Sequence, residues 1–258
     1  MAKISVATIN AYVAKRLKDT PTPANATINR ELAWLKLMFR LAVDAGKLVT
    51  RPKVTLLVED NAGQGFFEHA QYESVLRHLP EDLRPVVRFA YITGWRVKSE
   101  VLKLEWRHVD LKAGEVRLDP GTTKNKAGRT FPFTGELRTL LEAQHAEHER
   151  LKKQGTVVPW VFYRMVADGR RGKKKPQPIT SFIKAFKTAC RKAGCPGRLP
   201  HDMRRSAVRN LVRAGVPQSV AMKLTGHKTD SVFRRYDIVS PDDLRVAVER
   251  LDAMVVAR

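Results

Sequence analysis

The sequence predicts a mostly helical α+β protein with two domains, an all-helical one over residues 1–62 and a mixed one over residues 66–258. Apolar residues recur at steps of three and four along most of the chain, which is the period of a helix with one buried face. Residues 115–133 instead alternate apolar and polar side chains around two turn sequences, which indicates a small antiparallel sheet. Residues 61–65 hold two glycines and show no periodicity, so we expect the domain boundary there.

Two helices are expected in the first domain. The earlier one is marked by apolar residues at helical spacing: Ile9, Tyr12, Val13 and Leu17. The later one is expected to begin at Thr27 as a cap and to end before Gly46. Its main apolar stripe is Ile28, Leu32, Leu35, Phe39 and Ala42. A second apolar edge, Trp34, Met38 and Leu41, predicts that this helix is largely buried.

Several helices are expected in the second domain, at 70–79, 83–93, 97–104, 136–152, 181–194, 203–215, 217–226 and 241–258. Arg96 then begins a helix beside Gly94, where free backbone N–H groups can bind an anion. Residues 157–163 suit a short strand, and residues 169–176 form a basic loop. The last helix is amphipathic, with Leu244, Ala247, Leu251 and Met254 on one face.

The composition favours a polyanionic partner. The chain has 258 residues with 48 Lys plus Arg against 26 Asp plus Glu, which gives a net charge of +22. Such a charge repels itself unless a polyanion neutralises it, so we expect double-stranded DNA as the partner. Cys190 and Cys195 are too few for a disulfide framework or a structural zinc site, and we expect buried, inert thiols and no metal. Neither a signal peptide nor a membrane span is recognisable, so a cytoplasmic location is expected.

A metal-free cut in a DNA phosphodiester needs several kinds of side chain. Guanidinium groups bind the nonbridging oxygens, a tyrosine can attack phosphorus, and a lysine on a hairpin turn can protonate the leaving 5′ oxygen. Imidazoles hydrogen-bond a phosphate or move protons near neutral pH. The chain offers two arginines, a lysine, two histidines and a tyrosine for these tasks: Arg96, Arg204, Lys124, His201, His227 and Tyr236. Each alone is more often structural, and only their order and local context favour a site.

The order of these motifs resembles the tyrosine recombinase, or phage integrase, family. Residues 93–100, TGWRVKSE, resemble its first arginine box, so the catalytic arginine would be Arg96, supported by Glu100. Residues 123–132 resemble its hairpin segment, which carries the catalytic lysine Lys124. Residues 201–205, HDMRR, resemble its H-x-x-R box. Residues 224–227, LTGH, resemble its L-G-H motif with an inserted threonine, and Tyr236 follows His227 by the expected nine positions.

The resemblance implies a fold and a reaction. It implies the tyrosine-recombinase catalytic fold, preceded by a short helical core-binding domain that clamps DNA and looks shortened, with no separate arm-binding domain. Tyr236 would form a 3′-phosphotyrosyl bond, release a 5′ hydroxyl and rejoin the DNA without a cofactor or metal. It also implies a homo-tetramer on two duplexes that exchanges residues 241–258, and possible DNA-bending accessory proteins. Candidate DNA-contacting residues are Arg30, Lys36, Lys126, Arg129, Arg170, Lys173 and Arg205.

Other readings remain open. A type IB nicking-closing topoisomerase uses similar chemistry, although the compact size and the Gly226-His227 motif favour a recombinase. A non-catalytic DNA-binding protein is also possible, because residues 210–236 resemble a helix-turn-helix with Gly215 in its turn. That reading leaves Arg96 and Lys124 without a role. A decayed integrase that binds DNA without cutting it is a variant of the same reading.

Overall fold

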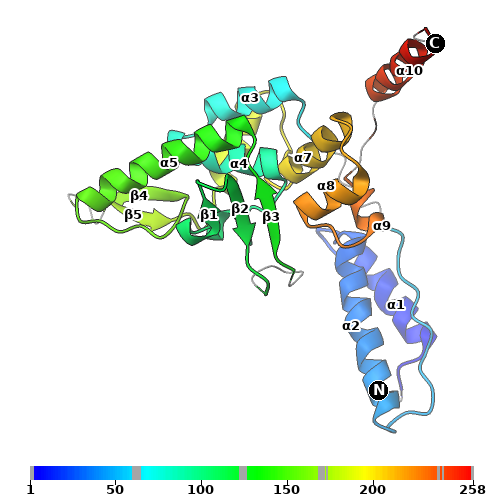
Figure 1. The fold of residues 1–258 in the computed structure, drawn as a ribbon. Helices are drawn as coiled ribbons and strands as arrows, with labels where there is room; N and C mark the ends of the chain where they lie inside the picture. The colour runs from blue at the N-terminus through cyan, green and yellow to red at the C-terminus, as the bar shows by residue number, and fades with distance from the viewer. Residues whose placement is uncertain are drawn as a thin grey trace. The chain divides into compact units, whose positions relative to one another are not determined.

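The structure, a computed structural model, describes residues 3–59, 65–121, 127–167, 172, 174–236, 239 and 241–256, without the side chains of 241, 242, 250, 251 and 253–256. The chain divides into two compact units, Met1–Gly63 and Gln64–Arg258. Figure 1 traces the path of the chain through both units. Among the described residues, none of the helices is long and apolar enough to cross a membrane.

The first unit is a pair of helices, α1 (Val6–Leu17) and α2 (Asn25–Asp44). Their shared core consists of Ile9, Ile28, Leu32, Phe39 and Val54. The segment after α2 is fixed to it by Asn29, whose Nδ2 donates to the Leu57 carbonyl and whose Oδ1 accepts from the Leu57 N–H, both at 2.8 Å. These bonds satisfy backbone groups of a segment that has no regular structure of its own.

Two expectations for α2 were wrong. The helix begins two residues before Thr27, with Ala24 at the N-cap and no side-chain cap. Its second apolar edge is exposed, with Trp34 at 66%, Met38 at 49% and Leu41 at 55%. The physical reason is that, within this unit, α1 and the segment after α2 cover only one face of the helix, and periodicity alone does not reveal how many faces are covered.

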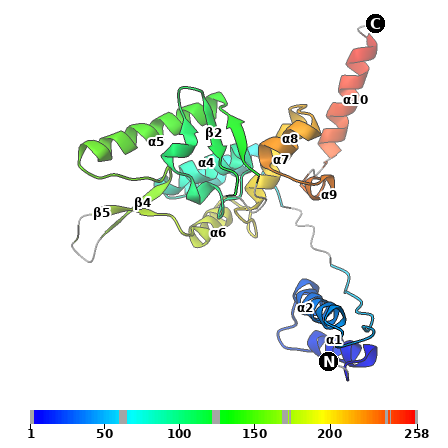
Figure 2. The same ribbon diagram turned by 60° about the horizontal axis from the view of Figure 1, so that its bottom comes forward.

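The second unit combines helices with two small sheets (Figure 2). Its first helices are α3 (His69–His78) and α4 (Arg84–Thr93), joined by the 3₁₀ turn η1 (Glu81–Leu83). The first sheet is antiparallel in the order β1 (Val109–Asp110), β2 (Glu115–Leu118), β3 (Arg129–Pro132). Val116 pairs with Phe131, and both are buried. The antiparallel pairing of β2 with β3, and the alternation of buried and exposed residues along β2, confirm the predicted sheet.

The remaining helices and strands follow in chain order, and the short helix at Asp230–Phe233 was not expected from the sequence. They are α5 (Gly135–Lys153), β4 (Tyr163–Ala167), β5 (Lys174–Pro178), α6 (Ile183–Lys192), α7 (Asp202–Arg213), α8 (Gln218–Thr225), α9 (Asp230–Phe233) and α10 (Pro241–Val256). Cys190 and Cys195 are buried free thiols as expected, and burial raises the pKa of Cys190 to about 12. Residues 60–64, which include most of the expected linker between the two domains, lie outside the described part of the chain.

Three local predictions needed correction. The basic loop expected at 169–176 is a strand from Lys174 onward, since β5 (Lys174–Pro178) pairs antiparallel with β4 from Tyr163↔Pro178 to Ala167↔Lys174. The strand expected at 157–163 therefore lies later, at Tyr163–Ala167. Ser181 does not cap α6, because the N-cap is Phe182 without a side-chain bond. Lysine and proline have low strand propensity, so the β4 partner rather than the local sequence establishes β5.

The core of the second unit is built around Trp95, which is fully buried. Phe89 of α4 meets the Trp95 ring edge-on at 5.6 Å, and Phe162 meets Phe89 in the same way at 5.4 Å. The Trp95 indole N–H donates to the Leu224 carbonyl at the end of α8 (3.1 Å). This bond joins the segment before Arg96 to the segment before His227, although 129 residues separate them.

Candidate active site

The segment around Arg96 is a compact turn rather than the start of a helix. Residues 97–100 are turn, followed by the 3₁₀ helix η2 (Val101–Lys103). The Glu100 carboxylate accepts from the Arg96 backbone N–H (2.7 Å) and from Arg96 Nη1 (2.8 Å). The backbone donor that was expected to be free for an anion is therefore occupied by Glu100, which itself is only 1% exposed. The Arg96 side chain remains partly open, at 24% exposure.

Arg204 lies in the first turn of α7 and is 2% exposed. Its Nη1 donates to the Gly94 carbonyl (2.6 Å) and the Thr225 carbonyl (2.5 Å). Gly94 has a left-handed backbone with φ of 65°, and a Cβ there would lie 2.9 Å from the Ala207 Cβ. Glycine thus allows the first arginine segment to approach α7 closely. Burial, followed by the charge of Arg96, lowers the pKa of Arg204 to about 10, so Arg204 stays cationic at neutral pH.

His227 is held in one orientation by Thr225. The Thr225 hydroxyl donates to the Ala221 carbonyl (2.7 Å) and lies 2.7 Å from His227 Nδ1, so Nδ1 carries the proton. His227 Nε2 then accepts from Arg204, with Nη2 at 2.9 Å and Nε at 3.2 Å. Burial and the positive charges of Arg204 and Arg96 lower the pKa of His227 to about 3. The imidazole is therefore neutral at physiological pH and serves as an acceptor for Arg204.

Tyr236 follows the short helix α9 and lies against both histidines. Its hydroxyl is 2.8 Å from Nε2 of His201, and its ring centroid is 4.8 Å from that of His227. The guanidinium carbons of Arg204 and Arg205 lie 5.7 and 5.8 Å from the ring centroid. Partial burial, followed by the charges of Arg205 and Arg204, lowers the pKa of His201. His201 is therefore mainly neutral near pH 7, and its Nε2 can accept the phenolic proton.

The structure thus brings five of the six predicted residues and Glu100 into one unit. The sixth, Lys124, lies outside the described residues, as do three of the expected DNA-contacting residues: Lys126, Arg170 and Lys173. Arg30 and Lys36 are exposed on α2, as a contact with a large ligand requires. Within the described part of the chain, no group of three or more His, Cys, Asp or Glu side chains is placed to hold a metal ion.

Two of the expected DNA contacts are engaged within the protein. The Arg129 side chain is 7% exposed and forms an ion pair with Glu100. It is therefore buried, whereas a DNA contact was expected from the sequence. Arg205 is 17% exposed and pairs with Asp202. The sequence did not indicate that Arg129 is buried, because a basic residue beside a turn is usually solvated. It also missed the role of Thr225, whose insertion before the glycine was the only available signal.

The comparisons with known proteins agree with this geometry. The sequence pattern of the phage integrase family matches residues 65–242, so the chain belongs to that family. The integrase of Salmonella phage P22 is 25% identical over 240 residues, which cover 91% of this chain and 59% of that protein. The tyrosine recombinase XerA of Pyrococcus furiosus is 27% identical over 187 residues, covering 71% of this chain and 60% of the relative. The chain thus spans about three fifths of these two relatives.

Solved structures show the same fold. The Tn1549 transposon integrase in complex with circular intermediate DNA superposes with a TM-score of 0.71 at 18% identity, covering 95% of this chain and 85% of that one. The XerH site-specific recombinase bound to palindromic difH substrate superposes with a TM-score of 0.65 at 15% identity, covering 98% and 74%. These likenesses confirm the expected mostly helical α+β fold with its small antiparallel sheet.

Proposed function

We propose that this protein is a site-specific DNA recombinase, an integrase that cuts and rejoins DNA through Tyr236. The observation that carries the proposal is the 2.8 Å contact between the Tyr236 hydroxyl and His201 Nε2, beside the buried Arg204. A phenol with a neutral imidazole on its oxygen and guanidinium groups nearby is arranged for attack on a phosphate. Membership of the phage integrase family supports the same reaction.

The proposed reaction has two reversible steps. The Tyr236 hydroxyl gives its proton to His201 and its oxygen attacks the scissile phosphorus, while the bond to the 5′ oxygen breaks. Arg96 and Arg204 stabilise the charge on the nonbridging oxygens, and His227 orients Arg204. Lys124 protonates the departing 5′ oxygen. A 5′ hydroxyl of a second strand then gives its proton to Lys124 and attacks the phosphorus, while the bond to Tyr236 breaks and the phenolate takes its proton back from His201. The bond energy is retained, and no metal or nucleotide cofactor is needed.

The proposed partner is double-stranded DNA. The net charge of +22 favours a polyanion, and binding should weaken steeply with salt because counterions are released. Residues 1–62 serve as the helical DNA clamp, and residues 66–258 carry the reaction. Exposed Arg30 and Lys36 contact the DNA backbone, as do Lys126, Arg170 and Lys173. We also propose a homo-tetramer on two duplexes that exchanges the segment 241–258, DNA-bending accessory proteins, and action in the cytoplasm on nucleoid DNA.

The test is a covalent trapping experiment. Nicked duplexes tiled across the DNA that flanks the gene for this protein are incubated with it, and protein–DNA adducts are separated on a denaturing gel. We expect an adduct at one site, its loss in Tyr236→Phe with DNA affinity retained, and its persistence in the matched control Tyr163→Phe. Cleavage should be unchanged by EDTA. An adduct formed by Tyr236→Phe would remove the proposed nucleophile, and DNA binding without any wild-type adduct would instead favour a decayed, non-catalytic integrase.

A further inference from the structure

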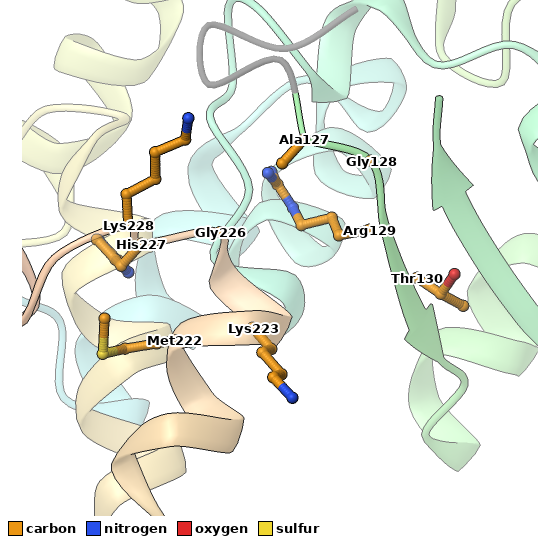
Figure 3. Close-up of a pocket in the computed structure, with 9 residues that line it drawn as sticks. All are labelled: Ala127, Gly128, Arg129, Thr130, Met222, Lys223, Gly226, His227 and Lys228. Carbon is orange, nitrogen blue, oxygen red and sulfur yellow. The ribbon is translucent and has the colours of Figure 1, made fainter. Parts of the chain in front are cut away.

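Arg129 begins strand β3, yet its side chain is directed into the protein rather than into solvent. Figure 3 shows it reaching from β3 toward Gly226 at the C-terminal end of α8. Its side chain is 7% exposed, and one guanidinium nitrogen, Nη2, donates to Glu100 Oε2. A charged group is rarely buried unless it is paired, so this pair is a built feature of the fold.

The guanidinium group is enclosed by two chain segments that each carry part of the candidate site, residues 95–100 and residues 226–227. The Arg129 Cζ lies 5.0 Å from the ring centroid of Trp95, the residue that immediately precedes Arg96. Its Nη1 lies where a side chain on Gly226 would begin, since a Cβ there would be 2.2 Å from Nη1 and 2.7 Å from Cζ. Gly226 also has a φ of 73°, which favours glycine. The glycine before His227 therefore leaves the space that Arg129 fills.

The charges explain what the buried arginine does. Glu100 is 1% exposed and also binds the Arg96 backbone and side chain. A carboxylate paired with Arg96 alone would largely cancel the charge of that arginine. With Arg129 as a second cation on the same carboxylate, the group keeps a net positive charge. Electrostatic interactions are strong where water is excluded, so this excess acts on a phosphate near Arg96.

We propose that Arg129 is a positioning residue of the phosphoryl-transfer site, which acts through Glu100. It fixes the carboxylate that orients Arg96, and it offsets the carboxylate's charge so that Arg96 remains electropositive toward the scissile phosphate. This inference rests on the function proposed above. It assigns Arg129 no direct contact with DNA, in contrast to the role expected from the sequence.

The experiment is a double-mutant cycle on the rate of adduct formation, with the duplex that traps wild-type protein. Arg129→Gln should slow cleavage about 100-fold, comparable to removing one charge-stabilising donor. Arg129→Lys keeps the charge but loses the planar fork, and should slow it about 10-fold. In a Glu100→Gln background there is no carboxylate to offset, so adding Arg129→Gln should cost less than about 3-fold. DNA affinity should stay within about 3-fold in every variant, because Arg129 is buried.

Arg138→Gln is the matched control, since this arginine also lies over an aromatic ring (Phe133, centroid at 5.4 Å) and pairs with a glutamate, Glu142, but at an exposed position on α5. It should leave the cleavage rate unchanged. Equal losses from Arg129→Gln with and without Glu100 would show that Arg129 acts only through packing and would overturn the inference. A normal rate in both Arg129 variants would overturn it as well, while the recombinase assignment would stand. If wild-type protein forms no adduct, both the recombinase assignment and this inference fall.

Discussion

The Tyr236 hydroxyl and Nε2 of His201 are 2.8 Å apart, although 35 residues separate them in the sequence. Because burial lowers the pKa of His201, its ring is mainly neutral at pH 7, and with the proton on Nδ1 its Nε2 accepts from the tyrosine hydroxyl. The same contact therefore places a proton acceptor on the nucleophile before any substrate binds. It gives the proposed reaction a pH dependence that can be measured.

The pH profile of cleavage should have its acidic limb below pH 6.5. His201 must be neutral to accept the proton, and its pKa lies below the ordinary value of 6.5, so the rate is kept as pH falls to 6.5 and is lost only as pH falls through the lowered pKa. Single-turnover adduct formation between pH 5 and 8 measures this. His201→Asn should react about 100-fold more slowly and show no such limb. An acidic limb above pH 6.5 in the wild type would mean that His201 is not the base.

His227 should make the fold acid-sensitive. Its pKa is about 3 in the folded protein against 6.5 in an unfolded chain, so the unfolded state binds an extra proton between those values and stability falls as pH falls. The slope from one such group is about 1.4 kcal/mol per pH unit. The unfolding free energy, measured with urea at several pH values between 4 and 6, should depend less on pH in His227→Gln, by about 1.4 kcal/mol per pH unit. His78→Gln, at an exposed position, is the control, and an unchanged slope in His227→Gln would refute the buried neutral ring.

Arg204→Lys should lose cleavage and keep DNA binding. Arg204 reaches two carbonyls and His227 at once, and a lysine ammonium lacks the planar fork needed to do so. We expect adduct formation to slow by about 100- to 1,000-fold. At 2% exposure the side chain adds little to the binding surface, so affinity should change less than about 3-fold. Parallel losses of affinity and rate would make Arg204 a DNA anchor instead.

The start of α10 should loosen in Asp243→Asn. Asp243 pairs with Arg209 (3.1 Å) and Arg213 (2.5 Å), which also bind Glu68 before α3. Weakening these pairs should cost about 1 kcal/mol of local stability. Amide hydrogen exchange over 244–250 should then accelerate about fivefold. Asp252→Asn, farther along the same helix, should leave exchange at 244–250 unchanged, and the same acceleration in both variants would contradict the anchoring role.

Local patterns predicted those features that depend on local physics. The apolar spacing predicted α4 and α7 because the apolar residues of each recur at steps of three and four, and the alternation around Val116 predicted the sheet. Strand β5 was missed because its pairing with β4 is tertiary and opposes its propensity. The exposed edge of α2 at Trp34 was missed because a stripe does not state what covers it.

The candidate site, too, was predicted only in part from the sequence. Motif order and spacing pointed to Arg96, Arg204 and Tyr236, since the resemblance rests on those residue types at those intervals. The burial of Arg129 against Glu100 could not be predicted from the sequence. It depends on a tertiary contact, in which the Arg129 guanidinium fills the space that a side chain on Gly226 would need. The turn after Arg96 was not predicted either, since it depends on the Glu100 carboxylate accepting a hydrogen bond from the Arg96 backbone N–H.

The hydrogen bonds that join the two ends of the second unit also affect how the protein is made. Phe67 N–H donates to the Ser206 hydroxyl across 139 residues, and Arg204 reaches Gly94 across 110. Contacts so distant in sequence close late and slowly during folding. Because Arg204, His227 and Tyr236 all come late in the chain, the site cannot assemble until most of the second unit has been synthesised.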